Sequence, residues 1–169
     1  MHKIGEYVNY GTEGVCRIED IRAMSFGKGG EEREYYILQP IGQGRSSVFV
    51  PVDNARLTGR MRPILTRQEI EEVVQSAKAC SLDWISDRKE RMEQFQKIMS
   101  ERDERQLLLL IGCLEEKARR RGRGISAAET QLLKKAENAI EQEFAFALQV
   151  SPQEISRYLQ AQLGQALGA

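Results

Sequence analysis

The hydrophobic periodicity of the chain changes near residue 63, and this change limits the possible folds more than any other feature. Before it, short runs rich in β-branched and aromatic residues alternate with glycine-containing turns, as in "EYVNY", "EYYILQPI" and "SSVFVPVD". After it, apolar residues recur at helical spacing and no strand pattern returns. The sequence therefore predicts an α+β protein, with a small antiparallel β-barrel or sheet in residues 1–63 and a compact helical bundle in residues 64–169.

Capping signals and apolar periodicity predict about five helices in the second domain. A Ser or Thr three residues before a Glu, the capping-box pattern, occurs at Thr66, Ser126 and Ser151. Pro152 adds a further helix-start signal after Ser151. We expect helices that begin after Thr66, cover about 84–99 and 103–121, follow Ser126, and cover 152–167.

Charge and cysteine content exclude several classes of protein. Lys+Arg and Asp+Glu both number 25, so any nucleic-acid contact must come from a local patch. The three cysteines are widely spaced and form no CxxC pair, which disfavours a disulfide framework and a zinc site and fits reduced thiols. The sequence has no leader-like apolar segment and no stretch approaching about 18 apolar residues. We expect a cytoplasmic protein with no membrane contact.

The residues that build active sites are largely missing. His2 is the only histidine and lies at the N-terminus, so no Ser–His–Asp or Cys–His arrangement can form on a rigid element. No phosphate-binding glycine loop lies between a strand and a helix. We expect no enzymatic activity, no cofactor, no metal and no small-molecule substrate.

Pro51 lies inside the strand pattern "VFVPV". Proline has no N–H to donate to a sheet, so this strand is predicted to lie at an edge or to end its pairing there. An unpaired edge can accept a strand from another protein. Alternatively, Pro51 only protects the edge from aggregation.

The only tryptophan, Trp84, lies in the charged stretch "SLDWISDRKER". If a helix begins near residue 84, Trp84 lies off the core face and above Arg88 and Arg91. The residues on the core face are then Ile85, Met92, Phe95 and Met99. An apolar wedge beside guanidinium groups suits a DNA minor-groove contact. In the alternative, Trp84 packs against a neighbouring helix and an arginine stacks on its ring.

A second basic patch, "KARRRGRG", closes the helix predicted to end near residue 121. Cations are favoured at a helix C-terminus by the helix dipole, so part of the patch needs no partner. The patch is nevertheless denser than capping requires and could bind phosphate. Its basic members are Lys117, Arg119, Arg120, Arg121 and Arg123.

Several stretches, in order and spacing, resemble the CarD/CdnL family of bacterial transcription regulators over about residues 3–148. They are "GEYVNYGTEGVCRIEDI", "EYYIL", "VFVPVDNARLTGRMRPI", Trp84 near a helix start, and "GRGISAAETQLLKKAENAIEQEFAFAL". The resemblance implies an N-terminal Tudor/SH3-like barrel, shared with transcription-repair coupling factors, that binds the RNA polymerase β subunit through an edge strand. It also implies that the helical domain contacts promoter DNA at the upstream edge of the −10 region and modulates open-complex stability, with no catalysis. The protein would then associate with the nucleoid through polymerase.

The resemblance assigns residues to both contacts. The predicted polymerase-binding residues are Met24, Ser47, Val48, Phe49, Val50 and Pro51. The predicted DNA-binding residues are Trp84, Arg88, Lys89, Arg91, Arg119, Arg120, Arg121 and Arg123. Family members often carry arginine at the position of Phe49 and basic residues at those of Met24, Ser86, Asp87, Thr130 and Gln131. These departures argue against an unchanged polymerase contact and against strong DNA affinity. The alternative is a protein–protein adaptor, with the edge strand binding another partner and the bundle serving as a dimerisation or spacer domain without DNA contact. The near-neutral bundle and the acidic residues around Trp84 favour this alternative.

Overall fold

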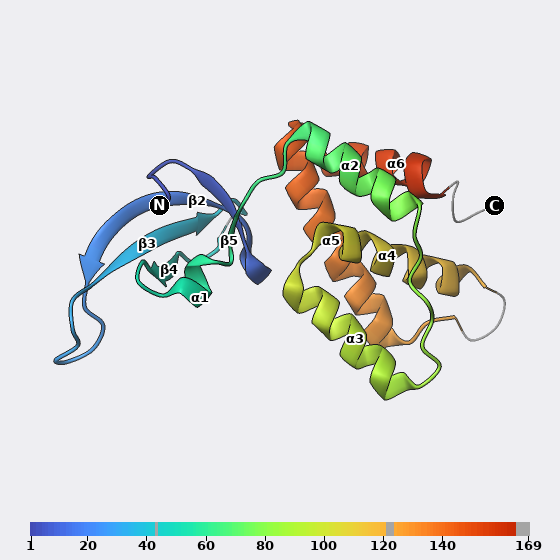
Figure 1. Ribbon diagram of the computed structural model, residues 1–169, viewed down its shortest axis with the longest axis horizontal. Helices are drawn as coiled ribbons and strands as arrows, with labels where there is room; N and C mark the ends of the chain where they lie inside the picture. Colours follow the sequence, from blue (N-terminus) through green and yellow to red (C-terminus); the bar gives the residue numbers. More distant parts are fainter. Residues whose placement is uncertain (43, 121–123, 165–169) are drawn as a thin grey trace. The chain divides into compact units, whose positions relative to one another are not determined.

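The computed structural model describes residues 1–42, 44–120 and 124–164. The chain forms two compact units, an N-terminal domain that ends at Ile64 and a helical domain that begins at Leu65 (Figure 1). Each has its own buried hydrophobic core. The predicted α+β class is therefore confirmed, with strands in the first unit and mainly helices in the second.

The N-terminal domain is a five-stranded antiparallel sheet with the order β4-β3-β2-β1-β5. Its strands are β1 (Tyr7–Tyr10), β2 (Gly14–Met24), β3 (Arg33–Pro40), β4 (Val48–Pro51) and β5 (Met61–Pro63). A 3-10 turn, η1 (Gly11–Glu13), joins β1 to β2, and a short helix, α1 (Ala55–Thr58), follows β4. Within the described residues no pairing joins β4 to β5, so the structure establishes a sheet and closure into a barrel stays a prediction.

Side-chain alternation along the strands builds the core of this sheet. In β4, Val50 is fully buried and Val48 is half-buried, whereas the intervening Phe49 points to the other face and is exposed. A register shift between Ile18 and Asp20 interrupts the pairing of β2 with β3. The buried cluster consists of Val8, Cys16, Ile18, Tyr36, Leu38, Val50 and Met61.

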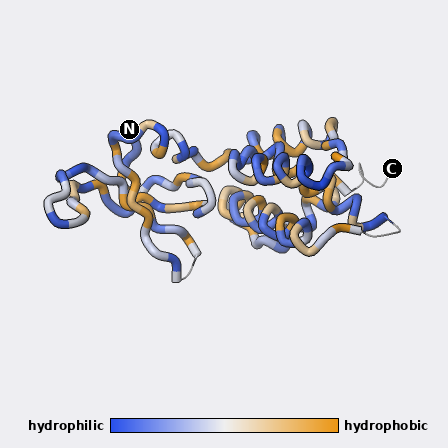
Figure 2. Tube along the Cα trace, turned by 90° about the horizontal axis from the view of Figure 1, so that it is seen from below, coloured by the Kyte–Doolittle hydropathy of each residue, from blue (hydrophilic) through white to orange (hydrophobic). Residues whose placement is uncertain are grey.

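The helical domain contains five α-helices among its described residues. They are α2 (Arg67–Lys78), α3 (Arg88–Glu101), α4 (Glu104–Arg119), α5 (Ala127–Leu148) and α6 (Pro152–Leu159), and a short π-helical segment, η2 (Gln160–Gly164), continues α6. The capping boxes predicted at Thr66, Ser126 and Ser151 are all confirmed. Hydrophobic and hydrophilic residues alternate along these helices, as Figure 2 shows, which is the pattern of helices with one buried side.

Helix α4 is the central element of this bundle. It packs against α2, α3 and α5, and Leu107 to Gly112 are consecutively buried along it. A helix that is apolar on nearly all sides is expected to be enclosed by others. The position of α4 among three other helices agrees with this composition.

The helix predicted over about 84–99 begins four residues later than expected. Asp87 has extended backbone angles, and its side chain accepts a hydrogen bond from the Glu90 N–H at 2.9 Å, so the helix starts at Arg88. This is an ordinary aspartate N-cap. Trp84 consequently lies in the non-helical segment before α3, and the helical geometry predicted for it is wrong.

Candidate functional site

Strand β4 is an edge of the sheet, because among the residues that the structure describes it pairs only with β3. The edge position predicted from Pro51 is therefore confirmed. Of the residues predicted to bind a partner here, Phe49 is 41% exposed, whereas Val50 is 0% exposed and belongs to the core. The Val50 side chain therefore belongs to the core, and the assignment of this strand as a binding surface stays a prediction. Met24 is the last residue of β2, pairs with Arg33 at the start of β3, and is half-buried.

The backbone of β4 explains why a proline is tolerated there. The Val52 N–H donates to the Glu34 carbonyl of β3 at 3.0 Å. Backbone N–H and carbonyl groups alternate in direction along a strand. Val50 and Val48 therefore also direct their N–H and carbonyl groups toward β3. The N–H and carbonyl of Phe49 and the carbonyl of Pro51 point away from the sheet. The missing N–H of Pro51 therefore costs no hydrogen bond with β3.

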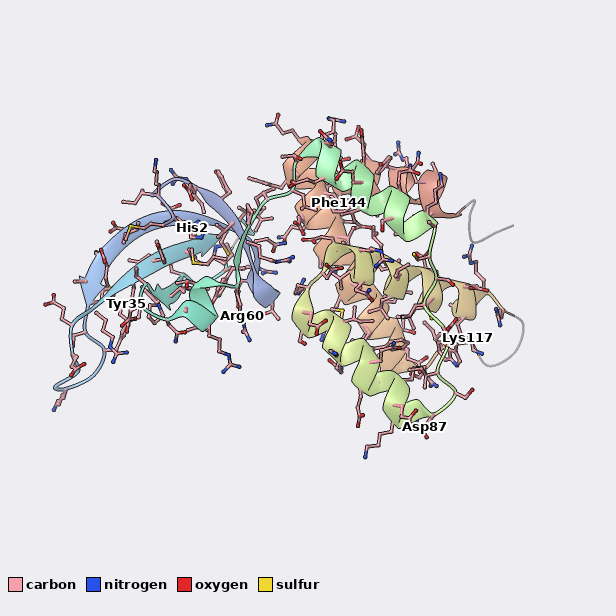
Figure 3. The ribbon with its side chains drawn as sticks, in the orientation of Figure 1. His2, Tyr35, Arg60, Asp87, Lys117 and Phe144 are labelled. Atoms are coloured by element: carbon pink, nitrogen blue, oxygen red, sulfur yellow. The ribbon has the colours of Figure 1, made fainter. Side chains whose placement is uncertain are left out.

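An aromatic cluster, formed by Phe26, Tyr35 and Phe49, covers the outer face of the sheet beside this edge. The Phe26 ring lies edge-on to Tyr35 at 5.2 Å and to Phe49 at 5.5 Å between ring centroids. Phe26 is 53% exposed, so the cluster is accessible. Tyr35, labelled in Figure 3, lies on β3 next to β4. Sequence reasoning missed Phe26 and Tyr35, because only strand pairing and the β2–β3 turn bring them to Phe49.

Trp84 packs against the core of the helical domain and is half-buried. Its ring lies edge-on to Phe95 of α3, with centroids 6.2 Å apart. The Arg91 guanidinium lies over the ring at 4.3 Å and the Lys117 ammonium at 4.9 Å. These are distances at which cations and aromatic rings attract each other. These contacts agree with the alternative in which Trp84 packs against a neighbouring helix and an arginine stacks on its ring.

Arg91 is buried in the helical domain and bonded within it, and its role as a DNA contact stays a prediction. It is 8% exposed, and its Nη1 donates to the carbonyls of Ile85 at 2.8 Å and Ser86 at 3.2 Å. Its Nη2 donates to Glu129 Oε1 at 3.0 Å. Glu129 is also the capping-box residue of α5, since its Oε2 accepts the Ser126 N–H at 3.3 Å. Arg91 thus joins the segment that carries Trp84 to the start of α5.

The other predicted basic residues that the structure describes lie near the surface at two helix ends. Arg88 and Lys89 are exposed in the first turn of α3. Arg119 and Arg120 are exposed at the end of α4, where Arg120 pairs with Glu116 at 2.7 Å and so uses part of its charge locally. Arg121 and Arg123 lie outside the described residues.

These two helix ends are brought together by Trp84. Its ring contacts Arg91, in the first turn of α3, and Lys117, in the last turn of α4. The exposed basic residues of both ends are within one turn of these contacts. Figure 3 shows Asp87 at the start of α3 and Lys117 toward the end of α4. Sequence reasoning placed Lys117 in the basic patch but did not connect it with the tryptophan.

A separate groove of about 620 Å³ lies among α4, α5 and α6. Its lining includes three carboxylates, Glu115, Glu137 and Glu141. Burial raises the pKa of Glu137 to about 7, aided by a hydrogen bond that its protonated carboxyl donates to the Glu115 carboxylate. Burial also raises the pKa of Glu141. The described part of the chain holds no His, Cys, Asp and Glu cluster that could bind a metal ion, and none of its helices is long and apolar enough to cross a membrane.

Comparison with known protein families identifies the N-terminal domain. Residues 2–65 match the family model described as the CarD-like/TRCF RID domain. The matched range contains the whole sheet, including the edge strand β4 and the aromatic cluster. The resemblance noted from the sequence is therefore confirmed for this domain, which is a protein-interaction domain with a role in transcription.

Proposed function

Because the N-terminal domain belongs to the CarD-like/TRCF RID family, we propose that it docks on the β subunit of RNA polymerase and thereby carries the helical domain to promoter DNA. There the helical domain contacts the upstream edge of the −10 region and modulates the stability of the open complex. The protein acts by binding alone, without catalysis, and reaches the nucleoid through polymerase.

The free edge of β4 is the observation that carries this proposal. It lies inside the family-matched range, and the N–H and carbonyl of Phe49 point outward from it. Addition of a strand to an exposed sheet edge is a common way for proteins to recognise an extended segment. The aromatic cluster beside the edge adds apolar surface of the kind that is enriched in protein interfaces.

The surroundings of Trp84 support the DNA contact. Four exposed arginine and lysine side chains lie within one turn of the two helix ends that its ring joins. Basic side chains can hold phosphate oxygens while an apolar ring contacts the minor groove. Buried contacts to Phe95 and Arg91 hold the ring in position before DNA is bound, which lowers the entropy cost of binding.

Tethering makes a weak DNA contact sufficient. Docking of the first domain raises the effective concentration of the second at the promoter. Contacts of Trp84 that form only with the distorted groove of the opening bubble favour the open state. If closed and open complexes were bound equally well, their equilibrium would not change.

The adaptor alternative is favoured by the same packing that holds Trp84. Its ring is half-buried, Arg91 is engaged inside the domain, and Arg120 is paired with Glu116. An adaptor needs none of these residues to be available for DNA.

Open-complex lifetime separates the two functions. The decay of heparin-challenged open complexes is measured with wild-type protein, with Trp84→Ala, and with no protein, at two salt concentrations. We expect the wild type to change the lifetime, and we expect Trp84→Ala to lose most of this change while still binding polymerase. Phosphate contacts weaken with salt, so the effect should diminish at higher salt. Equal lifetimes in all three reactions would exclude the DNA contact and favour the adaptor.

A further inference from the structure

We propose that Cys80 is a modification site, at which its sulfur forms a mixed disulfide with a small thiol that carries a carboxylate. A cavity of about 300 Å³ opens at this cysteine in the helical domain. It is lined by residues of α2, α4 and η2 and of the connection that follows α2. Cys80 lies in that connection, two residues after the end of α2. The site is separate from the residues assigned to polymerase and DNA, so it does not depend on the function proposed above.

Cys80 is the accessible thiol among the three cysteines, all of which the structure describes. It is exposed, whereas Cys16 is buried in the core of the sheet and Cys113 is half-buried in α4. Burial raises the pKa of the Cys16 thiol to about 11 and also raises the pKa of the Cys113 thiol. Because the thiolate is the form that attacks a disulfide, Cys16 and Cys113 are slow to react. A small disulfide therefore reaches Cys80 first.

An arginine contacts the Cys80 sulfur. Arg105 lies in the first turn of α4, and its Nη2 donates to Cys80 Sγ at 2.9 Å. A guanidinium beside a cysteine favours the negative charge that the sulfur carries as a nucleophile. The same contact holds the sulfur at the packing of α4 beside the end of α2.

Arg105 is incompletely satisfied by the protein itself. Its Nε is buried without a hydrogen-bond partner. Among the described residues its guanidinium forms no ion pair, and Cys80 Sγ is its hydrogen-bond acceptor. A buried donor without an acceptor is uncommon in folded proteins and indicates a missing partner. The charge of Arg105 is thus available to an anionic group bound at the sulfur.

The charges of the cavity also favour an anion. Lys78 lies in its lining, and its ammonium donates to the neutral side chain of Gln162 at 3.3 Å. Glu116 is the only carboxylate among the described residues of the lining, and it is paired with Arg120 at 2.7 Å. Lys78 and Arg105 therefore leave a net positive charge in and beside the cavity. The chain as a whole has equal numbers of basic and acidic residues, so this preference is local.

The size and walls of the cavity limit the ligand further. A volume of about 300 Å³ is at the lower end for ligand pockets, so a small group fits. Leu82, Leu109 and Leu163 supply apolar walls. These walls suit the methylene groups that separate a thiol from its carboxylate in a short chain. The ligand class is consequently a low-molecular-weight thiol acid.

The reaction is a thiol–disulfide exchange with the disulfide form of that thiol. The Cys80 thiolate attacks one sulfur of the small disulfide, a new S–S bond forms, and the original S–S bond breaks. The other half leaves as a thiolate and takes up the proton that Cys80 released, so Cys80 is oxidised and the leaving half is reduced. Cys113 lines the same cavity, but burial raises its pKa, so it stays protonated and does not displace the cap.

Two disulfide reagents of similar size and opposite charge test this site on the reduced full-length protein. Dithiodipropionate carries two carboxylates, and cystamine carries two ammonium groups. The rate at each cysteine is measured by peptide mass spectrometry, and each rate is divided by that of the same reagent with urea-unfolded protein. This ratio removes the intrinsic difference between the reagents.

We expect dithiodipropionate to label Cys80 at least about tenfold faster than Cys16 or Cys113. The normalised rate at Cys80 should be about tenfold higher for dithiodipropionate than for cystamine at low salt. This preference should shrink at about 0.5 M salt, because salt screens the exposed charges.

Variants identify the charges that set the preference. Arg105→Gln should lower the preference for dithiodipropionate about threefold or more, whereas Arg105→Lys, which keeps the charge, should retain most of it. Lys78→Gln, at an exposed position, tests the same field without disturbing the Arg105 contact and should also lower the preference. The matched control is Arg157→Gln, which removes an exposed positive charge of α6 that is not part of the cavity lining. This control should behave as the wild type does.

Several results would overturn the site. These are labelling of Cys16 or Cys113 as fast as Cys80, and equal normalised rates of the two reagents at low salt. A disulfide between Cys80 and Cys113 in place of the mixed disulfide would also overturn it, as would an unchanged preference in both Arg105→Gln and Lys78→Gln. None of these measurements involves polymerase or DNA, so their failure leaves the proposed function unaffected.

Discussion

Replacing Arg91 with methionine should destabilise the helical domain strongly, although the sequence places this arginine in a stretch of surface charge. In the folded protein its guanidinium lies 3.0 Å from the Glu129 carboxylate, and the two side chains are 10% and 3% exposed. The substitution leaves Glu129 buried without its cation. Removing one member of a buried ion pair typically costs about 3–5 kcal/mol.

The lower end of that range applies here, because Glu129 keeps one partner. Its Oε2 still accepts the Ser126 N–H at the start of α5, where the helix dipole also favours a negative charge. We therefore expect a loss of about 3 kcal/mol in the free energy of unfolding. For a domain of about 100 residues this corresponds to a fall in Tm of roughly 12–24 °C.

Urea denaturation followed by Trp84 fluorescence measures this loss, and a double-mutant cycle identifies its origin. Arg91 Nε is buried without a hydrogen-bond partner, so the ion pair is imperfect, and an apolar pair can replace it at little cost. Arg91→Met combined with Glu129→Leu should therefore be more stable than the sum of the single changes predicts. A loss below about 1 kcal/mol for Arg91→Met, or strictly additive single changes, would refute this reasoning.

Three further predictions concern the tryptophan, the α3 cap and the acidic groove. Trp84→Phe should retain more of the effect on open-complex lifetime than Trp84→Ala, because a phenyl ring preserves the packing on Phe95; equal lifetimes with both variants would exclude a role for the ring. Asp87→Ala should cost about 1 kcal/mol of unfolding free energy through loss of the cap, whereas Asp87→Asn, which keeps an acceptor, should cost less in the same urea titration. Because the pKa of Glu137 is raised to about 7, its carboxyl binds a proton more tightly in the folded state than in the unfolded state. The free energy of unfolding should therefore fall as pH rises from about 4.5 to 7. Glu137→Gln should reduce this fall, and an unchanged pH profile of the melting temperature would contradict the assignment.

Local signals in the sequence were sufficient for much of the fold. The three capping boxes and the edge proline act within a few residues of their own position, and each is present as predicted. The start of α3 was misjudged although its signal was also local. Asp87 followed three residues later by Glu90 is a capping pattern, and it lies inside the range of about 84–99 that was predicted to be helical.

The candidate site depended on contacts between distant residues, which periodicity does not reveal. Arg91 and Glu129 are 38 positions apart, so nothing near Arg91 indicates that its charge is neutralised in the interior. Phe26 meets Phe49 only because β3 lies between their segments and the β2–β3 turn folds back. A resemblance to a family assigned Phe49 and Trp84, but it could not show which neighbouring side chains hold them.

The central claim, that this protein docks on RNA polymerase through the β4 edge, is tested most directly by affinity co-purification with the full-length protein. Tagged wild-type protein and Phe49→Pro are expressed at equal levels, and the polymerase β subunit that co-purifies with each is quantified. The account predicts β subunit with the wild type and its loss with Phe49→Pro, while Ile41→Ala retains it. Absence of the β subunit from the wild-type sample, or equal recovery with Phe49→Pro, would contradict the claim.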